Sequence, residues 1–165
     1  MIRRARALVV GAYDLKPPNR SLTSISNVRA TEVAFIKDRV ASLLDEDFTF
    51  MRGEFGTCKN GQPRANVPFA HPAIADLIWV GCYSTLSRQD RAAYDPMPLP
   101  LIALAATVLY AALSSWSDGY FVLKAFSGET YAPSYRVLYK TAVEFRDSCP
   151  HRCRALIASY SLAMQ

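Results

Sequence analysis

The sequence predicts an all-α protein, a single compact domain of about six helices around a central apolar helix at residues 99–117. Apolar residues recur at three- and four-residue spacing along several segments, and strand-like alternation is nearly absent. The 22 residues from Pro96 to Ser117 carry no charge. A chain of 165 residues, about half of them hydrophobic, is long enough to bury such a core without disulfides.

The beginning of the chain combines a basic helix with a linker. Helical spacing of small apolar residues predicts a helix over 2–14, and Pro17-Pro18 ends it. Residues 1–30 hold six Lys and Arg against one Asp, so the net charge of +5 resides there. Within one domain spanning 1–165, residues 1–20 are therefore interpreted as a basic N-terminal helix and linker.

The next segments are a helix and a long irregular loop. A helix is predicted over 28–44, with Ser26 or Asn27 as its N-cap. Its apolar stripe consists of Val33, Ile36, Val40 and Leu43. Glycines and prolines punctuate residues 46–70, which predicts an irregular loop. Loops of this length in compact domains are usually functional or mobile.

A third helix should open at Pro72, with the His71 imidazole capping its first turn. A polar connection at 84–95 leads to the central helix, after which Gly119 is a plausible C′ residue. Two further helices are predicted at about 129–147 and from Cys149 onward.

The uncharged run at 96–117 fits either a buried helix or a membrane span. Its prolines, alanines and serines favour the buried helix. This interpretation predicts that Leu104 and Val108 are nearly fully buried, and that Leu104→Ala costs about 2–5 kcal/mol.

An aromatic-rich stretch accompanies this helix and the next. Aromatic rings with interleaved cations can stack nucleobases, and Lys124, Arg136 and Lys140 are interleaved here. The helical spacing instead favours packing in the core. The rings concerned are Tyr110, Trp116, Tyr120, Phe121, Phe126, Tyr131, Tyr135 and Tyr139.

A block with the pattern P-LIALAAT-LY-AL--W--G runs from residue 100 to Gly119, and PFAHPAI occupies residues 68–74. These strings resemble an uncharacterised domain family, a domain of unknown function abundant in mushroom-forming fungi. The resemblance covers most of the chain from about residue 28 onward. It implies a helical domain of fungal origin with no established activity and no catalytic residues to assign. Members often look longer at the N-terminus, which implies that Met1 begins a short or truncated version.

Motifs for catalysis and metal binding are missing. Cys149, His151 and Cys153 lie within five residues, but on a helix His151 points away from the two thiols, and no second ligand pair exists. There is no nucleophile elbow, phosphate loop, dinucleotide fingerprint or H-E-x-x-H helix. We therefore expect no metal and no cofactor. Four cysteines without a secretion signal predict free thiols in the cytoplasm or nucleus.

Two function classes remain open. The first is a non-enzymatic binding module that contacts nucleic acid or a protein, but no membrane, through the basic N-terminal segment or the 46–70 loop. Its candidate binding residues are Arg3, Arg4, Arg6, Lys59, Arg64 and His71. The second is an enzyme of unknown class with a site near His71 and the 46–70 loop. The segregated charge and the missing catalytic motifs favour the first. A third interpretation is an inert fragment of a multiplying gene family.

Overall fold

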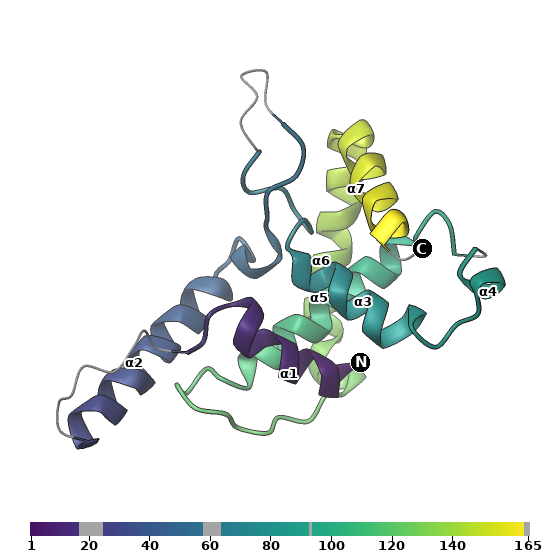
Figure 1. Cartoon of the computed structure of the whole chain (residues 1–165). Coiled ribbons are helices and arrows are strands. Elements are labelled where there is room, and N and C mark those ends of the chain that lie inside the picture. The colour runs from purple at the N-terminus through teal and green to yellow at the C-terminus, as the bar shows by residue number, and fades with distance from the viewer. Residues whose placement is uncertain (17–24, 58–63, 93, 164–165) are drawn as a thin grey trace.

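A computed structural model describes residues 1–16, 25–57, 64–92 and 94–163 (Figure 1). These residues form seven α-helices, a short 3-10 turn η1 and a π-helical turn η2, with no β-strand. The elements are α1 (Ile2–Ala12), α2 (Ile25–Leu43), η1 (Thr49–Met51), α3 (Pro72–Ile78), η2 (Trp79–Tyr83), α4 (Arg88–Ala92), α5 (Leu99–Ser114), α6 (Gly128–Ser148) and α7 (Pro150–Ala163). The all-α prediction is confirmed.

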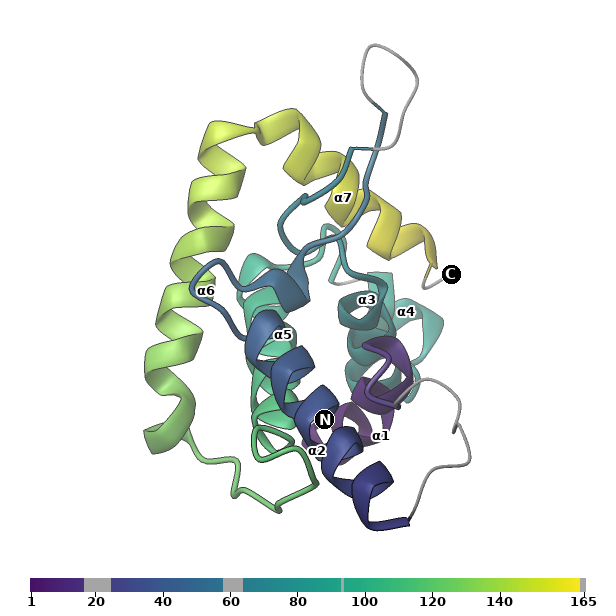
Figure 2. The same ribbon diagram turned by 90° about the vertical axis from the view of Figure 1, so that its left-hand side faces the viewer.

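The apolar helix α5 lies at the centre of the fold. Figure 2 shows it between α6 on one side and α1 and α3 on the other, and α5 contacts all three. Ala106, Leu109 and Leu113 are completely buried. The two buried hydroxyls, Thr107 on this helix and Ser115 at its C-cap, donate to carbonyls four residues earlier, Thr107 to Ala103 at 2.7 Å and Ser115 to Ala111 at 3.2 Å. Such pairing avoids the penalty for a buried polar group without a partner.

The end of α5 differs from the prediction. The helix ends at Ser114, and Gly119 lies in a following turn with φ +82°, so it is not the C′ residue of the helix. A Cβ at Gly119 would lie 2.3 Å from the Val33 carbonyl oxygen of α2. Only glycine permits both the left-handed backbone and this close approach.

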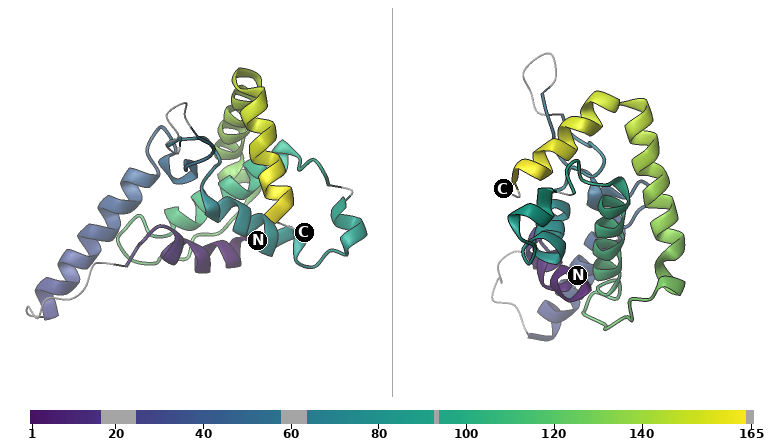
Figure 3. Two further views of the ribbon diagram at one scale, coloured as in Figure 1. Left: turned by 45° about the horizontal axis from the view of Figure 1, so that its top comes forward. Right: turned by 90° about the vertical axis from the view of Figure 1, so that its right-hand side faces the viewer.

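Helices α6 and α7 form a bent pair that wraps around α5 (Figure 3). Helix α6 begins at Gly128 after the N-cap residue Ser127, whose hydroxyl accepts from the Thr130 N–H at 3.2 Å. It buries Leu138 and Ala142 against the core. Pro150 opens α7, which buries Cys153, Leu156 and Tyr160 in the core.

The irregular 46–70 segment is tied to the helices by two buried tyrosines. The Tyr13 hydroxyl donates to the Phe50 carbonyl at 3.0 Å, and the Tyr160 hydroxyl donates to the Phe69 carbonyl. An isolated antiparallel bridge joins Gly53 and Val67. The described residues from Gly53 to Thr57 and from Arg64 to Val67 form an arm that rises from the body beside α7 (Figure 1).

Two helix starts were predicted wrongly. Ser26 and Asn27 are not caps, because α2 already begins at Ile25. The expected polar connection at 84–95 contains the short helix α4. The missed signal is Ser87 as an N-cap: its hydroxyl accepts from the Asp90 N–H at 3.2 Å and donates to the Asp90 carboxylate at 2.6 Å.

The burial of Leu104 was also predicted wrongly. Val108 is 1% exposed, as expected, but Leu104 is 38% exposed. Helix α6 covers only part of α5, and Leu104 lines an open depression between the two helices. An apolar helix can therefore have an exposed position where its neighbouring helix does not reach.

The aromatic stretch contributes less to the core than predicted. Of its rings, Tyr131 is buried, and Tyr110, Trp116 and Tyr135 are half-buried. The exposed rings are those of Tyr120, Phe121, Phe126 and Tyr139. Three of these exposed rings, those of Tyr120, Phe121 and Phe126, lie in the connection between α5 and α6.

None of the described helices is long and apolar enough to cross a membrane; α5 itself has 16 residues. The uncharged run at 96–117 is thus divided between a core helix and the turns on either side of it.

The unequal exposure of two α5 leucines leads to a stability prediction. Leu109→Ala should cost about 2–5 kcal/mol of unfolding free energy, since it leaves a cavity in a closed core. Leu104→Ala should cost only about 1 kcal/mol, because its side chain is already partly in water. Urea unfolding at low protein concentration measures both. Equal losses would contradict the placement of Leu104 at an open face.

Candidate functional site

Two depressions lined by described residues are considered, and we call them the basic pocket and the apolar groove. The basic pocket has a volume of about 490 Å³ and lies between the arm and the junction of α6 with α7. Its lining consists of Phe55, Gly56, Thr57, Arg64, Ser148, Cys149, Pro150, His151, Arg152 and Ala155. Both charged side chains in this set are arginines, one from each side of the pocket.

Backbone pairing in the arm positions Arg64. Its N–H donates to the Gly56 carbonyl at 3.0 Å, and its carbonyl accepts from the Phe55 N–H at 3.0 Å. Its Nε donates to the Thr57 carbonyl at 2.8 Å. Among the described residues the two Nη groups have no partner, so the outer edge of the guanidinium can bind a ligand.

The first turn of α7 supplies the opposite wall. Backbone N–H groups in the first turn of a helix have no intrahelical acceptor, and the helix dipole makes this end positive. Arg152 is exposed there and has no partner among the described residues. The His151 Nδ1 accepts from the Arg154 guanidinium at 3.1 Å, since arginine has only donors. The other ring nitrogen, Nε2, therefore carries the proton of the neutral imidazole.

The electrostatics of this pocket favour an anion. Two acidic residues, Glu54 and Asp147, are adjacent in sequence to the lining, and both lie outside it. Asp147 pairs with Arg146 at 2.8 Å, and this hydrogen bond lowers its pKa. The negative charge of Asp147 is thus balanced by Arg146 rather than by the pocket arginines. Guanidinium groups bind phosphate oxygens bidentately, and N–H groups at a helix start add further donors.

The structure separates the three arginines predicted on the N-terminal helix. Arg3 and Arg4 are exposed on α1, but Arg6 is half-buried. Its Nη2 donates to the Lys124 carbonyl, in the connection between α5 and α6, and its Nε is buried without a partner. Arg6 therefore holds two parts of the fold together, and the cluster available to a ligand on α1 reduces to two residues.

Of the two predicted candidates in the 46–70 loop, Arg64 lies in the basic pocket. Lys59 falls outside the described residues. The sequence analysis missed Arg152 and His151 as partners of Arg64. No local sequence pattern predicts this proximity, because only the tertiary fold brings residues 64 and 152 to one cavity.

His71 has a structural position. Its Nδ1 accepts from the Ala73 N–H at 3.2 Å, which confirms the predicted cap of α3. Its ring stacks on Tyr13, with 4.4 Å between ring centroids. Burial lowers the pKa of His71, against a smaller opposing effect of Asp76. His71 lines neither depression described here, and no observation favours the enzyme hypothesis at this residue.

The apolar groove has a volume of about 540 Å³ and lies between α5 and the first half of α6. No charged residue lines it. The lining residues are Tyr94, Pro98, Pro100, Leu101, Leu104, Thr107, Phe126, Ser127, Gly128, Tyr131, Ala132 and Tyr135. The sequence analysis assigned most of these residues to the core, so it did not predict the groove.

The predicted thiols are free where the structure describes them. Cys82 and Cys149 are half-buried and Cys153 is buried, and burial raises the pKa of Cys82 and Cys153. In the described part of the chain, no three His, Cys, Asp or Glu residues lie close enough together to hold a metal ion.

Comparison with known families gives one match. A model for a domain of unknown function, DUF6532, matches residues 1–145. The chain belongs to this family. The DUF6532 match includes α1, so it begins earlier than the resemblance from about residue 28 suggested. Neither the curated proteins nor the solved structures contain a match to the chain. The groove and the arm lie inside the matched range of DUF6532, whereas α7 follows it.

The buried position of His71 leads to a prediction about pH. Its folded-state pKa is lower than the unfolded value of about 6.5, so the unfolded chain takes up the proton first as the pH falls. The contribution of His71 to the unfolding free energy should therefore be constant above the unfolded-state pKa. It should decrease as the pH falls below that value, until the folded-state pKa is reached.

The matched variant is His71→Asn, because asparagine keeps an N-cap acceptor and does not titrate. Urea unfolding between neutral and mildly acidic pH should show a smaller loss for this variant than for the wild type. His151→Asn, at an exposed histidine, should keep the wild-type loss. An unchanged loss in His71→Asn would contradict the assignment.

Proposed function

We propose that this DUF6532 domain is a non-enzymatic binding module, and that its basic pocket binds a phosphate group of a single-stranded nucleic acid. The observation that supports this most strongly is the convergence of Arg64 and Arg152 on one cavity at the start of α7. Two guanidiniums on opposite walls can contact one phosphate from both sides. Pro150 has no N–H and the Cys153 N–H donates to the Cys149 carbonyl, so the N–H groups of His151 and Arg152 are the ones that can bond the remaining oxygens.

A nucleic acid is favoured over an acidic protein for two reasons. The cavity of about 490 Å³ is in the size range of small-ligand sites and can admit a phosphate with its sugar, and its lining includes an aromatic residue, Phe55, of the kind that stacks on bases. The net charge of +5 resides in residues 1–30, outside the pocket lining, so it contributes only a long-range attraction for polyanions. With two phosphate-contacting arginines, binding should be weak and independent of sequence.

The positions of the arginines make the basic pocket a better phosphate site than α1. Arg3 and Arg4 lie on an exposed helix face and line neither depression described above, and Arg6 is bonded to the Lys124 carbonyl. The aromatic stretch is a weaker candidate as well. Lys124 donates to the Ser114 carbonyl at 2.6 Å, and Lys140 pairs with Glu144 at 3.7 Å. Two of its three cations are therefore engaged within the protein.

Two double variants with the same charge change test this assignment. Anisotropy titrations of a labelled oligothymidylate against the Arg64→Gln/Arg152→Gln variant should show binding about tenfold weaker or more. The log–log salt slope should become less steep by about 0.7 for each phosphate that the variant no longer neutralises. The Arg3→Gln/Arg4→Gln variant should lose little affinity and keep the wild-type slope.

Equal losses in the two variants would mean that only net charge matters, and the pocket assignment would fail. A loss confined to the Arg3 and Arg4 variant would move the site to α1. If the wild type binds no oligonucleotide at low salt, the domain is not a nucleic-acid module. Circular dichroism of each variant separates a binding defect from unfolding.

We further propose an intracellular location, cytoplasmic or nuclear. Free thiols at Cys82, Cys149 and Cys153 support it, since reducing compartments preserve thiols. The fungal origin expected from the resemblance belongs to this proposal as well.

A further inference from the structure

His71 lies where the arm joins the body of the domain. Its N–H donates to the Met51 carbonyl at 3.2 Å, which closes the base of the arm between η1 and the start of α3. Its ring stacks on Tyr13 of α1, and its Nδ1 accepts from the Ala73 N–H of α3. A Cβ at Gly53, the first arm residue, would lie 2.8 Å from the His71 nitrogen. The arm is therefore attached to the helices at this histidine.

The hydrogen bond at Nδ1 exists only while the His71 imidazole is neutral. Because Nδ1 accepts from the Ala73 N–H, the proton of the neutral ring is on Nε2, and a second proton must go to Nδ1. The protonated Nδ1 is a donor that faces another donor, so the charged ring has to rotate away from the cap. This rotation also breaks the stack on Tyr13, in which the two ring planes differ by only 17°.

The charged and titratable groups on the packed elements do not retain a proton on the His71 ring. Asp76 of α3 is exposed, and its attraction raises the pKa of His71 less than burial lowers it. On α1 and α7, burial raises the pKa of the Tyr13 and Tyr160 phenols, so both remain neutral. Arg52, which follows η1, is a cation and donates to two backbone carbonyls of the arm base. The imidazolium is therefore better solvated by water than in this position.

The base of the arm is strained, so it depends on these contacts. Phe48 and Phe69 flank it with left-handed backbone, at φ 51° and φ 62°. A bulky residue keeps this conformation only where the surrounding structure enforces it. One of the enforcing contacts is the bond from the Tyr13 hydroxyl to the Phe50 carbonyl, and the His71 ring supports the Tyr13 ring from one face. Loss of the His71 ring contact therefore weakens the anchor of a segment that relaxes when released.

We propose that His71 is a pH-sensitive switch of the arm: when its imidazole takes up a proton, the arm separates from the body and Arg64 moves away from Arg152. The bridge between Gly53 and Val67 belongs to no sheet, and an isolated pair of extended segments is marginal in water, so the released arm loses this pairing as well. The opening rests on the contacts of His71 alone. Its effect on ligand binding rests on the function proposed above for the basic pocket.

Amide hydrogen exchange of the purified chain tests the opening. The reporters are the Gly53, Val67 and His71 amides, whose acceptors lie within the arm base. After correction for the intrinsic exchange rate, their exchange should accelerate about three- to tenfold between neutral pH and about one unit below 6.5, since the open form takes up the proton first. The chain has two histidines. His71→Asn should abolish the acceleration, and His151→Asn should keep it.

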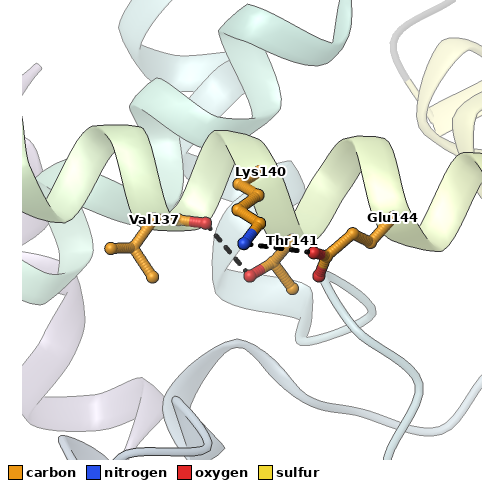
Figure 4. Close-up of polar contacts among 4 residues, drawn as sticks. All are labelled: Val137, Lys140, Thr141 and Glu144. Carbon is orange, nitrogen blue, oxygen red and sulfur yellow. Dashed lines mark hydrogen bonds and ion pairs between the residues drawn. The ribbon is translucent and has the colours of Figure 1, made fainter.

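Amides in the middle of α6, such as that of the buried Leu138, are the reference for global unfolding. The outward face of this stretch bonds within the helix itself: Figure 4 shows Lys140 paired with Glu144 and the Thr141 hydroxyl donating to the Val137 carbonyl at 3.1 Å. Low urea concentrations accelerate exchange by global unfolding more than exchange by a local opening, because a local opening exposes less surface. The arm amides should therefore exchange faster than the reference amides and respond less to urea.

A ligand of the basic pocket should act on the same equilibrium in the opposite direction. Oligothymidylate at about ten times its dissociation constant should slow the exchange of the arm amides about tenfold, because it binds only the closed arm. In the Arg64→Gln/Arg152→Gln variant this slowing should disappear, while the acceleration by acid remains. Acceleration by acid without any slowing by oligothymidylate would support the switch and contradict the proposed nucleic-acid site, so the two proposals fail separately.

Arm amides that do not accelerate in acid, or that accelerate equally in His71→Asn, would overturn the switch. Arm amides with the same rates and the same urea response as the α6 reference would overturn it as well, because the acid effect would then be global unfolding. Circular dichroism shows whether each variant is folded. If His71→Asn does not fold, an NMR titration of the wild-type His71 ring decides: a midpoint at or above 6.5 would contradict the proposal, since the closed arm would then bind the proton no less tightly than the open arm.

Discussion

The burial of α5 is the constraint on which the other features depend. A helix without charge from Leu99 to Ser114 has no face that water solvates well, so neighbouring helices must cover it. Helices α1, α3 and α6 do so, and α2 approaches the turn that follows α5 through the contact at Gly119. The cover is incomplete at Leu104. The core and the apolar groove therefore have the same origin, because the groove lies where α6 leaves α5 uncovered.

The basic pocket depends on a different interaction, the anchoring of an irregular segment by buried hydroxyls. Tyr13 and Tyr160 donate to backbone carbonyls of residues 50 and 69, at the two ends of the arm's base. Burial raises the pKa of both phenols, so they remain neutral donors at physiological pH. Without these bonds the carbonyls would be buried without partners. Because the base is held against α1 and α7, Arg64 reaches the first turn of α7.

Much of the helical content could be predicted from the sequence, whereas the site could be predicted only in part. Helical spacing located α5 and α6 to within a few residues, because periodic burial leaves a periodic pattern. The local capping chemistry of His71 was likewise predicted correctly. Arg64 was recognised as a candidate from its loop. Its partner Arg152 was not, since 88 residues separate them in the sequence. Arg6 was predicted to bind a ligand, yet its guanidinium donates to the Lys124 carbonyl in the connection between α5 and α6.

The sequence by itself determined the fold class, the apolar central helix and the excess of positive charge near the N-terminus. These are properties of composition and of local periodicity, and backbone geometry converts them directly into helices and buried faces. Only the tertiary structure decided which apolar residues stay exposed, as Leu104 and Leu123 show. It also decided which cations remain available to a ligand, as Arg152 and Lys124 show. The reason is that exposure and pairing depend on how far a neighbouring helix extends, which no local pattern encodes.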